Sequence, residues 1–428
     1  MTNSKLKDSN IEWLGKIPRD WKVKPLYLFF FERKNKNNKG KEKNLLSLSY
    51  GKIIQKDINS TGGLLPQSYN TYNVIEAGDI IIRPTDLQND KHSLRTAFSK
   101  EHGIITSAYI DLAPLKDTNS EYFHYVLHAY DIEKVFYNMG NGVRQGLNYS
   151  EFSKLKLPIP SSEEQKEIVN FLNNQVSQID KLSKKIQQEI TNLEEYRNSI
   201  IVKAVTKGLN PNVLMKDSGI PWIGKIPQQW NIEPIYLHFY QGKNKNNLGK
   251  EKNLLSLSYG KIIRKNINSV GGLLPSSYNT YNIVEAGDII IRPTDLQNDK
   301  RSLRTGLVTE HGIITSAYLD LKPKTKNSSR YYHYLLHAYD IQKVFYNMGN
   351  GVRQGLNFSE FSKLKILVPN LKNQLAISDY LDNLNKKISK IILNKKSQLE
   401  KLNQYKQSII YEYVTGKKQV PTEEGVQE

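Results

Sequence analysis

Cysteine is absent from the 428 residues of this chain. Its absence excludes disulfide bonds, zinc sites built from thiolates and catalysis by a cysteine nucleophile. Long apolar runs are also lacking. The longest early run, Leu26–Phe31, is too short to span a bilayer, and the first ten residues are too polar for a secretory signal. We therefore expect a cytoplasmic protein that does not enter a membrane.

Acidic residues are too few to balance the basic ones. The chain has 61 Lys and Arg against 42 Asp and Glu, which gives a formal net charge of +19 and a pI near 9.5. This excess favours a polyanionic partner such as nucleic acid, although ribosomal, membrane-surface and highly soluble proteins are also this basic. The 38% hydrophobic content is that of a folded protein.

The sequence repeats itself with a shift of 209 residues, the interval from Trp13 to Trp222. Gly40–Ile54 returns letter for letter as Gly249–Ile263. Solenoid repeats are only about 20–50 residues long, so each copy here is a whole folding unit. Two equal units can present two equal binding surfaces, which favours a partner that is itself repeated or two-fold symmetric.

Each copy begins with a region rich in Gly, Pro and Asn, over Ile11–Pro160 and Ile220–Pro369. Short β-like runs such as Asp79–Arg83 lie among turn signals, and a turn at residues 77–79 precedes the apolar run. Apolar residues at three- and four-residue steps predict a helix over Ser120–Tyr137. We interpret each region as a compact α/β globule.

The pattern changes after Pro160, where Ser161 is a candidate N-cap and no proline or glycine follows until after Lys207. Apolar residues then recur every seven positions in both copies, and Lys395 interrupts the second series. The expected main seam is Leu172, Ile179, Ile186, Leu193 and Ile200 with Leu381, Ile388, Leu402 and Ile409, and the companion seam is Leu182, Tyr196, Leu384, Ile391 and Tyr405. Two such helices can pair into a rod of roughly 65 Å, at about 1.5 Å per residue, or pack on their own globules.

Catalytic and metal motifs are lacking. Gly219–Lys225 has the spacing of a phosphate-binding loop, but Ile226 stands where Ser or Thr should bind magnesium. No amino-methyltransferase tetrapeptide, HExxH helix or paired-carboxylate nuclease core is present. The pairs His124/His128 and His333/His337 have a metal-capable spacing without an acidic third ligand, so we expect packing or surface histidines. We predict no catalytic residue, no metal site and no cofactor in this chain.

Three repeated segments are candidates for nucleic-acid binding. A cationic loop could reach phosphate oxygens or simply be solvated. An Asn-Gly-Val-Arg-Gln-Gly segment offers Arg for guanine and Gln for adenine, or forms a turn whose Arg pairs with an Asp. A third loop begins at Arg83. The candidate residues are Lys36, Lys41, Arg83, Thr85, Asn141, Arg144 and Gln145 in the first copy, and Lys245, Lys250, Arg292, Thr294, Asn350, Arg353 and Gln354 in the second.

Several segments together resemble one family. The opening Ile11–Trp21 returns as Ile220–Trp230, and Leu157–Pro160 leads into Glu164 and Gln165 at the start of the helix. The second copy keeps Val368, Pro369 and Gln374 but has Asn373 in place of the acid, and a linker follows Val205 through Pro211 to Gly219. In order and duplication, these segments resemble the specificity subunit of a type I DNA restriction–modification system over nearly the whole chain.

The resemblance implies two target recognition domains that alternate with two long helices, packed as an antiparallel coiled coil with pseudo-two-fold symmetry. It implies double-stranded DNA as ligand, two modification subunits that use S-adenosylmethionine to methylate adenine at N6, and two restriction subunits that use ATP and Mg where the system also cleaves. The expected parts are recognition domains over residues 1–160 and 209–369, spacer helices over 161–208 and 370–418, and a disordered tail over 419–428.

The near-identity of the two copies adds a hypothesis: like surfaces related by a two-fold axis read an interrupted palindrome. The copies differ at Gln55/Arg264, Asp57/Asn266, His92/Arg301 and residues 97–100 against 306–309, where one half-site could change. Two other functions stay open. One is a coiled-coil scaffold whose partner is not DNA, and the other is a self-sufficient DNA enzyme with an unfamiliar site.

Overall fold

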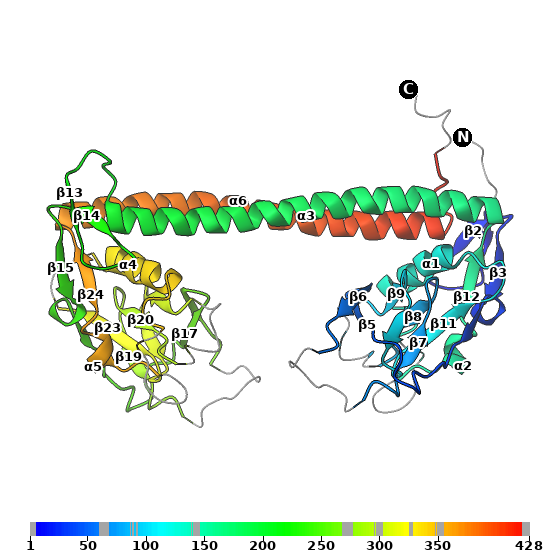
Figure 1. Ribbon diagram of the computed structural model, residues 1–428, viewed down its shortest axis with the longest axis horizontal. Coiled ribbons are helices and arrows are strands. Elements are labelled where there is room, and N and C mark those ends of the chain that lie inside the picture. Colours follow the sequence, from blue (N-terminus) through cyan, green and yellow to red (C-terminus); the bar gives the residue numbers. More distant parts are fainter. Residues whose placement is uncertain are drawn as a thin grey trace. The chain divides into compact units, whose positions relative to one another are not determined.

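The structure is a computed structural model, in which the contacts form two compact units. Unit 1 combines Met1–Ile186 with Ser397–Glu428, and unit 2 is Gln187–Lys396. Each unit holds one globule and one half of each long helix, α3 (Ser162–Lys207) and α6 (Leu371–Val414) (Figure 1). The structure describes residues 6–59, 68–85, 87, 90, 93–137, 139, 146–267, 277–294, 296, 303–324, 328–346, 348 and 355–421.

Globule 1, the part of unit 1 before α3, contains two four-stranded sheets and two short ribbons. The sheets have the strand orders β6-β5-β10-β7 and β4-β11-β8-β9, and the ribbons pair β1 with β2 and β3 with β12. Its elements are β1 (Leu6–Asp8), β2 (Lys16–Pro18), β3 (Lys22–Pro25), η1 (Leu26–Leu28), β4 (Phe30–Glu32), β5 (Leu45–Ser49), β6 (Lys52–Lys56), β7 (Asn73–Ile75), β8 (Ile80–Ile82), β9 (Thr96–Phe98), β10 (Gly103–Ile105), β11 (Ile110–Pro114), α1 (Ser120–Ile132), α2 (Tyr149–Phe152) and β12 (Lys156–Ile159).

Globule 2, the part of unit 2 between α3 and α6, repeats this topology. One sheet has the order β16-β23-β20-β21, and the pairs β17–β18 and β19–β22 are joined by a parallel bridge between Leu254 and Ile313. Its elements are β13 (Met215–Asp217), β14 (Lys225–Pro227), β15 (Asn231–Pro234), η2 (Ile235–Leu237), β16 (Phe239–Gln241), β17 (Leu255–Ser258), β18 (Lys261–Arg264), β19 (Asn282–Val284), β20 (Ile289–Ile291), β21 (Thr305–Leu307), β22 (Gly312–Ile314), β23 (Leu319–Pro323), α4 (Ser329–Ile341), α5 (Phe358–Phe361) and β24 (Lys365–Val368).

The central strand β8 forms where the sequence predicts it. Gly78 takes a φ of 100°, a conformation that glycine adopts without steric cost, and so completes the turn before the strand. All three side chains of Ile80–Ile82 are fully buried because both faces of the strand are covered: Ile80 and Ile82 belong to one apolar cluster, and Ile81 belongs to another. A run of apolar β-branched residues is the pattern expected of a strand covered on both faces.

Helix α1 is shorter than the sequence analysis predicted. Asn119 caps its first turn by accepting a 3.2 Å hydrogen bond from the backbone N–H of Tyr122. The helix ends at Ile132 rather than at Tyr137, because Lys134 takes a left-handed φ of 57° and the N–H of Val135 turns back to the carbonyl of Tyr130 at 2.9 Å. The prediction over residues 133–137 was wrong, since apolar spacing does not report a left-handed residue.

The long helices are capped by side chains and run antiparallel within each unit. Ser161 accepts from the N–H of Glu164 at 3.2 Å at the start of α3. In unit 1, Asp180 of α3 bonds Lys406 of α6 at 2.7 Å. In unit 2, Glu189 bonds Lys395 at 2.5 Å, so the lysine that interrupts the heptad pattern has an anionic partner on the facing helix.

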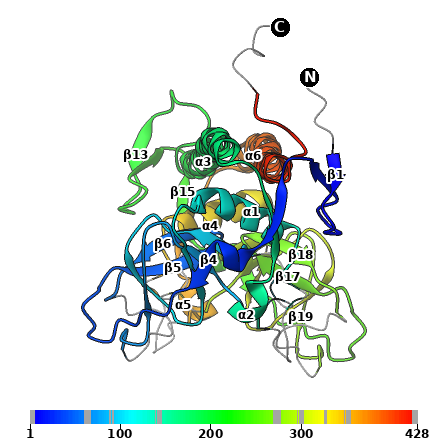
Figure 2. The same ribbon diagram turned by 90° about the vertical axis from the view of Figure 1, so that its right-hand side faces the viewer.

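The predicted main seam is buried over most of its length, but the companion seam is wrong. Leu182, Tyr196, Ile391 and Tyr405 are between 44% and 56% exposed. The buried positions beside the main seam are instead Ile190, Ile201, Ile392 and Ile410. The buried stripe is displaced because each helix half packs on its globule as well as on the other helix. One apolar cluster joins Leu172 and Ile410 to residues of α1, the helix that lies beside α3 and α6 in unit 1 (Figure 2). Both packing arrangements considered for these helices therefore occur together.

A lysine at the end of α3 and another just after the end of α6 each hold the opening segment of a globule. In unit 1 the ammonium of Lys417 donates to the carbonyls of Leu14 at 2.7 Å and Lys16 at 2.6 Å. In unit 2 Lys207 bonds the corresponding carbonyls of Ile223 and Lys225. Across the described ranges, no helix has an apolar stretch long enough to cross a membrane.

Candidate nucleic-acid interface

In each globule, residues that flank two predicted recognition loops are hydrogen-bonded to each other. In globule 1 the N–H of Leu147 donates to the carbonyl of Pro84 at 3.0 Å, and in globule 2 Leu356 bonds Pro293 at 2.9 Å. The prolines belong to the first loop, the segment that begins at Arg83 or Arg292. The leucines directly follow the second loop, the Asn-Gly-Val-Arg-Gln-Gly segment. Two segments about 60 residues apart in sequence are thereby fixed side by side.

A buried arginine that the sequence analysis did not single out supports the first loop of globule 1. The side chain of Arg95 is fully buried. Its guanidinium donates to the carbonyl of Thr85, to the carbonyl of Asp90 at 2.5 Å and to the hydroxyl of Tyr137 at 3.4 Å. One residue therefore connects the loop after Arg83 to the chain that leaves α1.

An acid and a tyrosine complete this network. Asp131 accepts from the backbone N–H of Arg95, and its other oxygen accepts from the hydroxyl of Tyr137 at 3.0 Å. The ammonium of Lys134 bonds the same hydroxyl at 3.0 Å and lies 4.4 Å from the ring centroid. Burial raises the pKa of Asp131, while the hydrogen bond from Arg95 opposes that rise.

Globule 2 contains the same network. Arg304 is fully buried, donates to the carbonyl of Thr294 at 2.5 Å and lies 5.1 Å from the ring centroid of Tyr346. Asp340 accepts from the backbone of Arg304 at 2.5 Å and from the hydroxyl of Tyr346 at 3.0 Å. In both copies, therefore, a buried arginine bonds the carbonyl of the equivalent threonine, and the equivalent acid accepts from the backbone of that arginine.

The predicted residues of the first loop are exposed or partly exposed. Thr85 and Thr294 are exposed, and their carbonyls receive the buried arginines. Arg83 is partly exposed, and its guanidinium bonds Asp90 at 3.3 Å, while its backbone N–H is held by the carbonyl of Arg95 at 2.8 Å. The backbone of Arg292 is held in the same way by Arg304 at 2.8 Å.

In each cationic loop one lysine is anchored to the backbone and another is exposed. Lys36 donates to the carbonyl of Thr71 at 3.1 Å, and Lys245 donates to that of Thr280 at 3.0 Å. Lys41 and Lys250 are exposed. Six other predicted site residues lie outside the described residues: Asn141, Arg144, Gln145, Asn350, Arg353 and Gln354.

A groove of about 390 Å³ in globule 1 brings the predicted segments together. Lys34 of the cationic loop, Pro84 of the first loop and Leu147 of the second all line it. So does Tyr109, from a turn that the sequence analysis did not propose for binding. The available signal was identity between copies, because residues 101–109 and 310–318 have the same sequence.

Beneath the cationic loop, two buried carboxylates face a single cation. In globule 1 Asp79 and Asp111 are at most 1% exposed, and Arg33 lies 3.0 Å from Asp79 and 3.7 Å from Asp111. Burial, together with the charge of Asp79, raises the pKa of Asp111. This cluster ties the start of the cationic loop to strand β11, since Arg33 also donates its backbone N–H to the carbonyl of Asp111 at 2.9 Å.

The histidine pairs are packing residues of the junction between globule and helices. The rings of His124 and His128 are 5.9 Å apart, and burial lowers their pKa values to about 3 and about 4. Burial lowers the pKa of His333 to about 4 and that of His337 to about 3 in the second copy. Within the part of the chain that the structure describes, no three His, Asp or Glu side chains are grouped to hold a metal ion.

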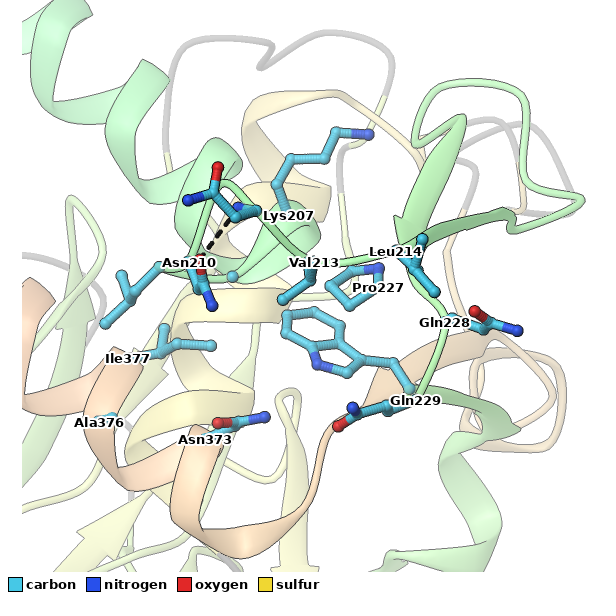
Figure 3. Close-up of a pocket in the computed structure, with 14 residues that line it drawn as sticks. Lys207, Asn210, Val213, Leu214, Pro227, Gln228, Gln229, Asn373, Ala376 and Ile377 are labelled. Atoms are coloured by element: carbon cyan, nitrogen blue, oxygen red, sulfur yellow. Dashed lines mark hydrogen bonds between the residues drawn. The ribbon is translucent and has the colours of Figure 1, made fainter.

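Another pocket lies in unit 2, away from these loops. It measures about 780 Å³ and lies where the end of α3 meets the start of α6 (Figure 3). Its lining is mainly amide and apolar, and includes the ring of Trp230 and the side chains of Asn373 and Ile377. Lys207, its one charged lining residue, already donates to two backbone carbonyls. We therefore do not include this pocket in the nucleic-acid interface.

Comparison with known proteins decides the family. Residues 18–192 and 306–401, together more than half of the chain, match the family described as type I restriction modification DNA specificity domain. The chain belongs to this family. This specificity subunit has the DNA recognition domains of a type I restriction–modification system, and the family implies DNA and methyltransferase or restriction partners.

Two relatives of this specificity subunit come from Methanocaldococcus jannaschii. The putative type I restriction enzyme MjaX specificity subunit is 24% identical, with 96% of each chain covered. The type I restriction enzyme MjaVIII specificity subunit is also 24% identical, over 79% of this chain and 80% of that protein. A chain from a solved structure concerning complex assembly and conformational transition of the type I R-M system has a TM-score of 0.63 at 13% identity, over 93% of this chain and 98% of that chain, and so shares the fold.

Proposed function

We propose that this specificity subunit directs adenine-N6 methylation, and cleavage where restriction subunits join, to an interrupted palindrome in double-stranded DNA. The observation that carries the proposal is the identity of the two candidate surfaces. Three contacts recur in both globules: the bond between the residues that flank the two loops, the bond of the buried arginine to a threonine carbonyl, and the bond of the anchored lysine. Equal surfaces read equal half-sites, and a two-fold relation between them makes those half-sites reverse complements.

The candidate residues divide between two tasks. Exposed Lys41 and Lys250 suit phosphate oxygens, which give affinity without sequence preference. Side chains of the other two loops would then read base edges. The assignment of Arg144 and Arg353 to guanine, and of Gln145 and Gln354 to adenine, remains a proposal from sequence.

Differences between the copies could make the half-sites unequal at one base. Gln55 bonds Asn44 at 2.9 Å, whereas Arg264 at the equivalent position pairs with Glu310, with 2.9 Å between Arg264 Nε and Glu310 Oε1. Both residues lie on the exposed edge strands β6 and β18. A base contact made by one of them alone would be worth about 1–3 kcal/mol at that base pair.

The catalytic steps belong, in this proposal, to partner subunits. Modification subunits would bind S-adenosylmethionine, and restriction subunits would use ATP and Mg. The exposed companion-seam residues offer a docking surface for two modification subunits, one on each unit. Unit 1 presents Leu182 and Tyr405, and unit 2 presents their repeat equivalents Ile391 and Tyr196. Large apolar side chains left half-exposed on a helix pair are typical of a site for partner helices.

The test is a methylation map. The chain is produced with the modification subunit of its system in a host that lacks adenine methylation, and the genome is read by modification-sensitive long-read sequencing. We expect one interrupted palindrome, methylated on both strands. A split motif with unrelated halves would refute the palindrome while leaving the specificity role intact.

The methylation map, together with two further assays, separates the other functions. A folded complex that methylates nothing, together with binding that does not depend on DNA sequence, would favour a scaffold with another partner. Purified chain that methylates or cleaves DNA on its own, supplied with magnesium and a methyl donor, would instead reveal an active site in this chain.

A further inference from the structure

We infer that Arg95 and Arg304 are positioning residues for DNA reading: from inside its globule, each holds the backbone at the start of a recognition loop. The inference rests on the proposed function. Neither residue reaches DNA itself, because both side chains are fully buried. Each acts through the exposed loop whose backbone it holds.

The contacts of Arg95 fix both sides of the first loop and reach the second. Two guanidinium nitrogens bind the carbonyls of Thr85 and Asp90, which stand on either side of the loop's centre. The third reaches Tyr137, from which the chain runs into the second loop. On the far side of that loop, Leu147 bonds Pro84, next to Thr85. Bonds at Thr85, Asp90, Tyr137 and Leu147 therefore hold the flanking residues of the two loops together.

Stability alone does not explain a guanidinium at this place. Taking a charge out of water is costly, and apolar side chains of similar volume often give equal or greater stability than a buried ion pair. What an apolar side chain cannot supply is a rigid planar set of donors aimed at separate carbonyls, and lysine lacks that shape as well. The geometry is therefore the property that only arginine provides here.

Comparison of the copies separates this network from its surroundings. Two residues after the arginine the sequences diverge, with Ala97–Lys100 in one copy and Gly306–Thr309 in the other. Even so, the arginine, its acid and its tyrosine are the same in both, and their contacts agree. The network is kept where neighbouring core positions are free to change.

Loop position should affect base reading more than overall affinity. Hydrogen bonds to base edges need donor–acceptor distances of about 2.7–3.2 Å and good alignment. Phosphate contacts from a flexible, exposed lysine such as Lys41 tolerate a shifted loop, because the interaction is mainly with charge. Loss of the arginine should therefore reduce discrimination between sequences more than binding to DNA in general.

The experiment measures methylation of duplexes that carry one wrong base pair in one half-site, using the chain in complex with its modification subunit. The wild-type complex should methylate a duplex poorly when either half-site carries a wrong base pair. With Arg95→Met we expect discrimination against wrong base pairs to stay unchanged in one half-site. In the other half-site it should fall by about tenfold or more at several positions. Arg304→Met should give the same pattern, and the double variant should relax both halves. The salt dependence of DNA binding should not change.

Controls separate positioning from folding. Leu14→Ala opens a cavity in the same core without touching the loops, so it should lower the unfolding temperature while both halves stay strict. Tyr137→Phe keeps the ring but removes the hydroxyl that joins Arg95 to the segment before the second loop. This variant replaces Arg95→Met if the latter does not fold. We expect Tyr137→Phe to relax one half in the same way, by a smaller factor.

Two results would overturn the inference. One is a folded arginine or tyrosine variant that rejects mismatches in both halves as the wild type does. The other is an equal loss of affinity for every sequence, which is what a purely structural role produces. A wild-type complex that shows no sequence-selective methylation would refute the proposed function instead, so the two failures are distinct.

Discussion

At the scale of single residues, the two copies neutralise the same buried acids from different strands. Asp79 and Asp111 face Arg33, which follows β4. In globule 2 the equivalent acids are Asp288 and Asp320, but position 242 is glycine and the cation is Lys322 on β23, whose counterpart is Ala113. Gly242 leaves the required space, since a Cβ atom there would lie 2.0 Å from a carboxylate oxygen of Asp320.

This exchange predicts a compensating pair of substitutions. Arg33→Gly should cost about 3–5 kcal/mol of unfolding free energy, because it leaves two buried carboxylates without a cation. Adding Ala113→Lys should recover most of that loss by building the arrangement of globule 2. Chemical denaturation of the wild type and the single and double variants measures both effects. A double variant no more stable than the single one would show that the two cations are not equivalent.

At the scale of elements, the two globules bind their helices with different charges. In unit 1, Asn173 of α3 donates to Glu121 at 3.0 Å and accepts from Tyr125 at 2.7 Å. In unit 2, Arg330 pairs with Asp382 at 2.5 Å and Asp379 at 2.9 Å, both on α6. The candidate DNA-binding surfaces are alike, whereas the surfaces that attach the globules to the helices are not.

Reversing the charge of Arg330 tests whether the contact between globule 2 and α6 depends on opposite charges. Arg330→Glu would place a third carboxylate beside Asp379 and Asp382, and we expect a loss of about 1–2 kcal/mol, which is modest because these groups are partly exposed. Adding Asp379→Asn and Asp382→Asn recreates the chemistry of unit 1 and should restore the unfolding temperature. Thermal unfolding of the full chain decides this, and the same two asparagines beside an unchanged Arg330 are the control.

At the scale of the whole molecule, each unit carries an equivalent apolar pair on its helices. Leu182 and Tyr405 belong to unit 1, and Ile391 and Tyr196 belong to unit 2. All four are half-exposed, and none of them takes part in the buried seam. Under the proposed function, this pair of sites sets the number of modification subunits at two.

Substitution in one unit should therefore remove one subunit. Leu182→Glu with Tyr405→Glu places charge on the docking surface of unit 1, and we expect a complex with one modification subunit instead of two. Native mass spectrometry or light scattering reads this directly. Ile391→Glu with Tyr196→Glu should give the same mass, and all four changes together should abolish the complex. A full complex from the first variant would show that docking occurs elsewhere.

Much of the fold could be predicted because it depends on local sequence patterns. The run Ile80–Ile82 after a glycine turn predicts a buried strand, and the long helix without proline or glycine predicts α3 within a residue of its observed ends. The companion seam failed because a heptad pattern assumes one helical neighbour, whereas each helix half here has a globule as a second neighbour. The end of α1 failed because it depends on one left-handed residue, Lys134.

The sequence by itself determined the duplication, the alternation of globule and helix, and the family, since each depends on letters that recur or follow one another along the chain. Only the tertiary structure decided how the candidate surface is held. Arg95 meets partners 5, 10 and 42 residues away, and Arg33 meets an acid 46 residues away. Such contacts follow from the packing of strands and helices in three dimensions, which no local pattern records.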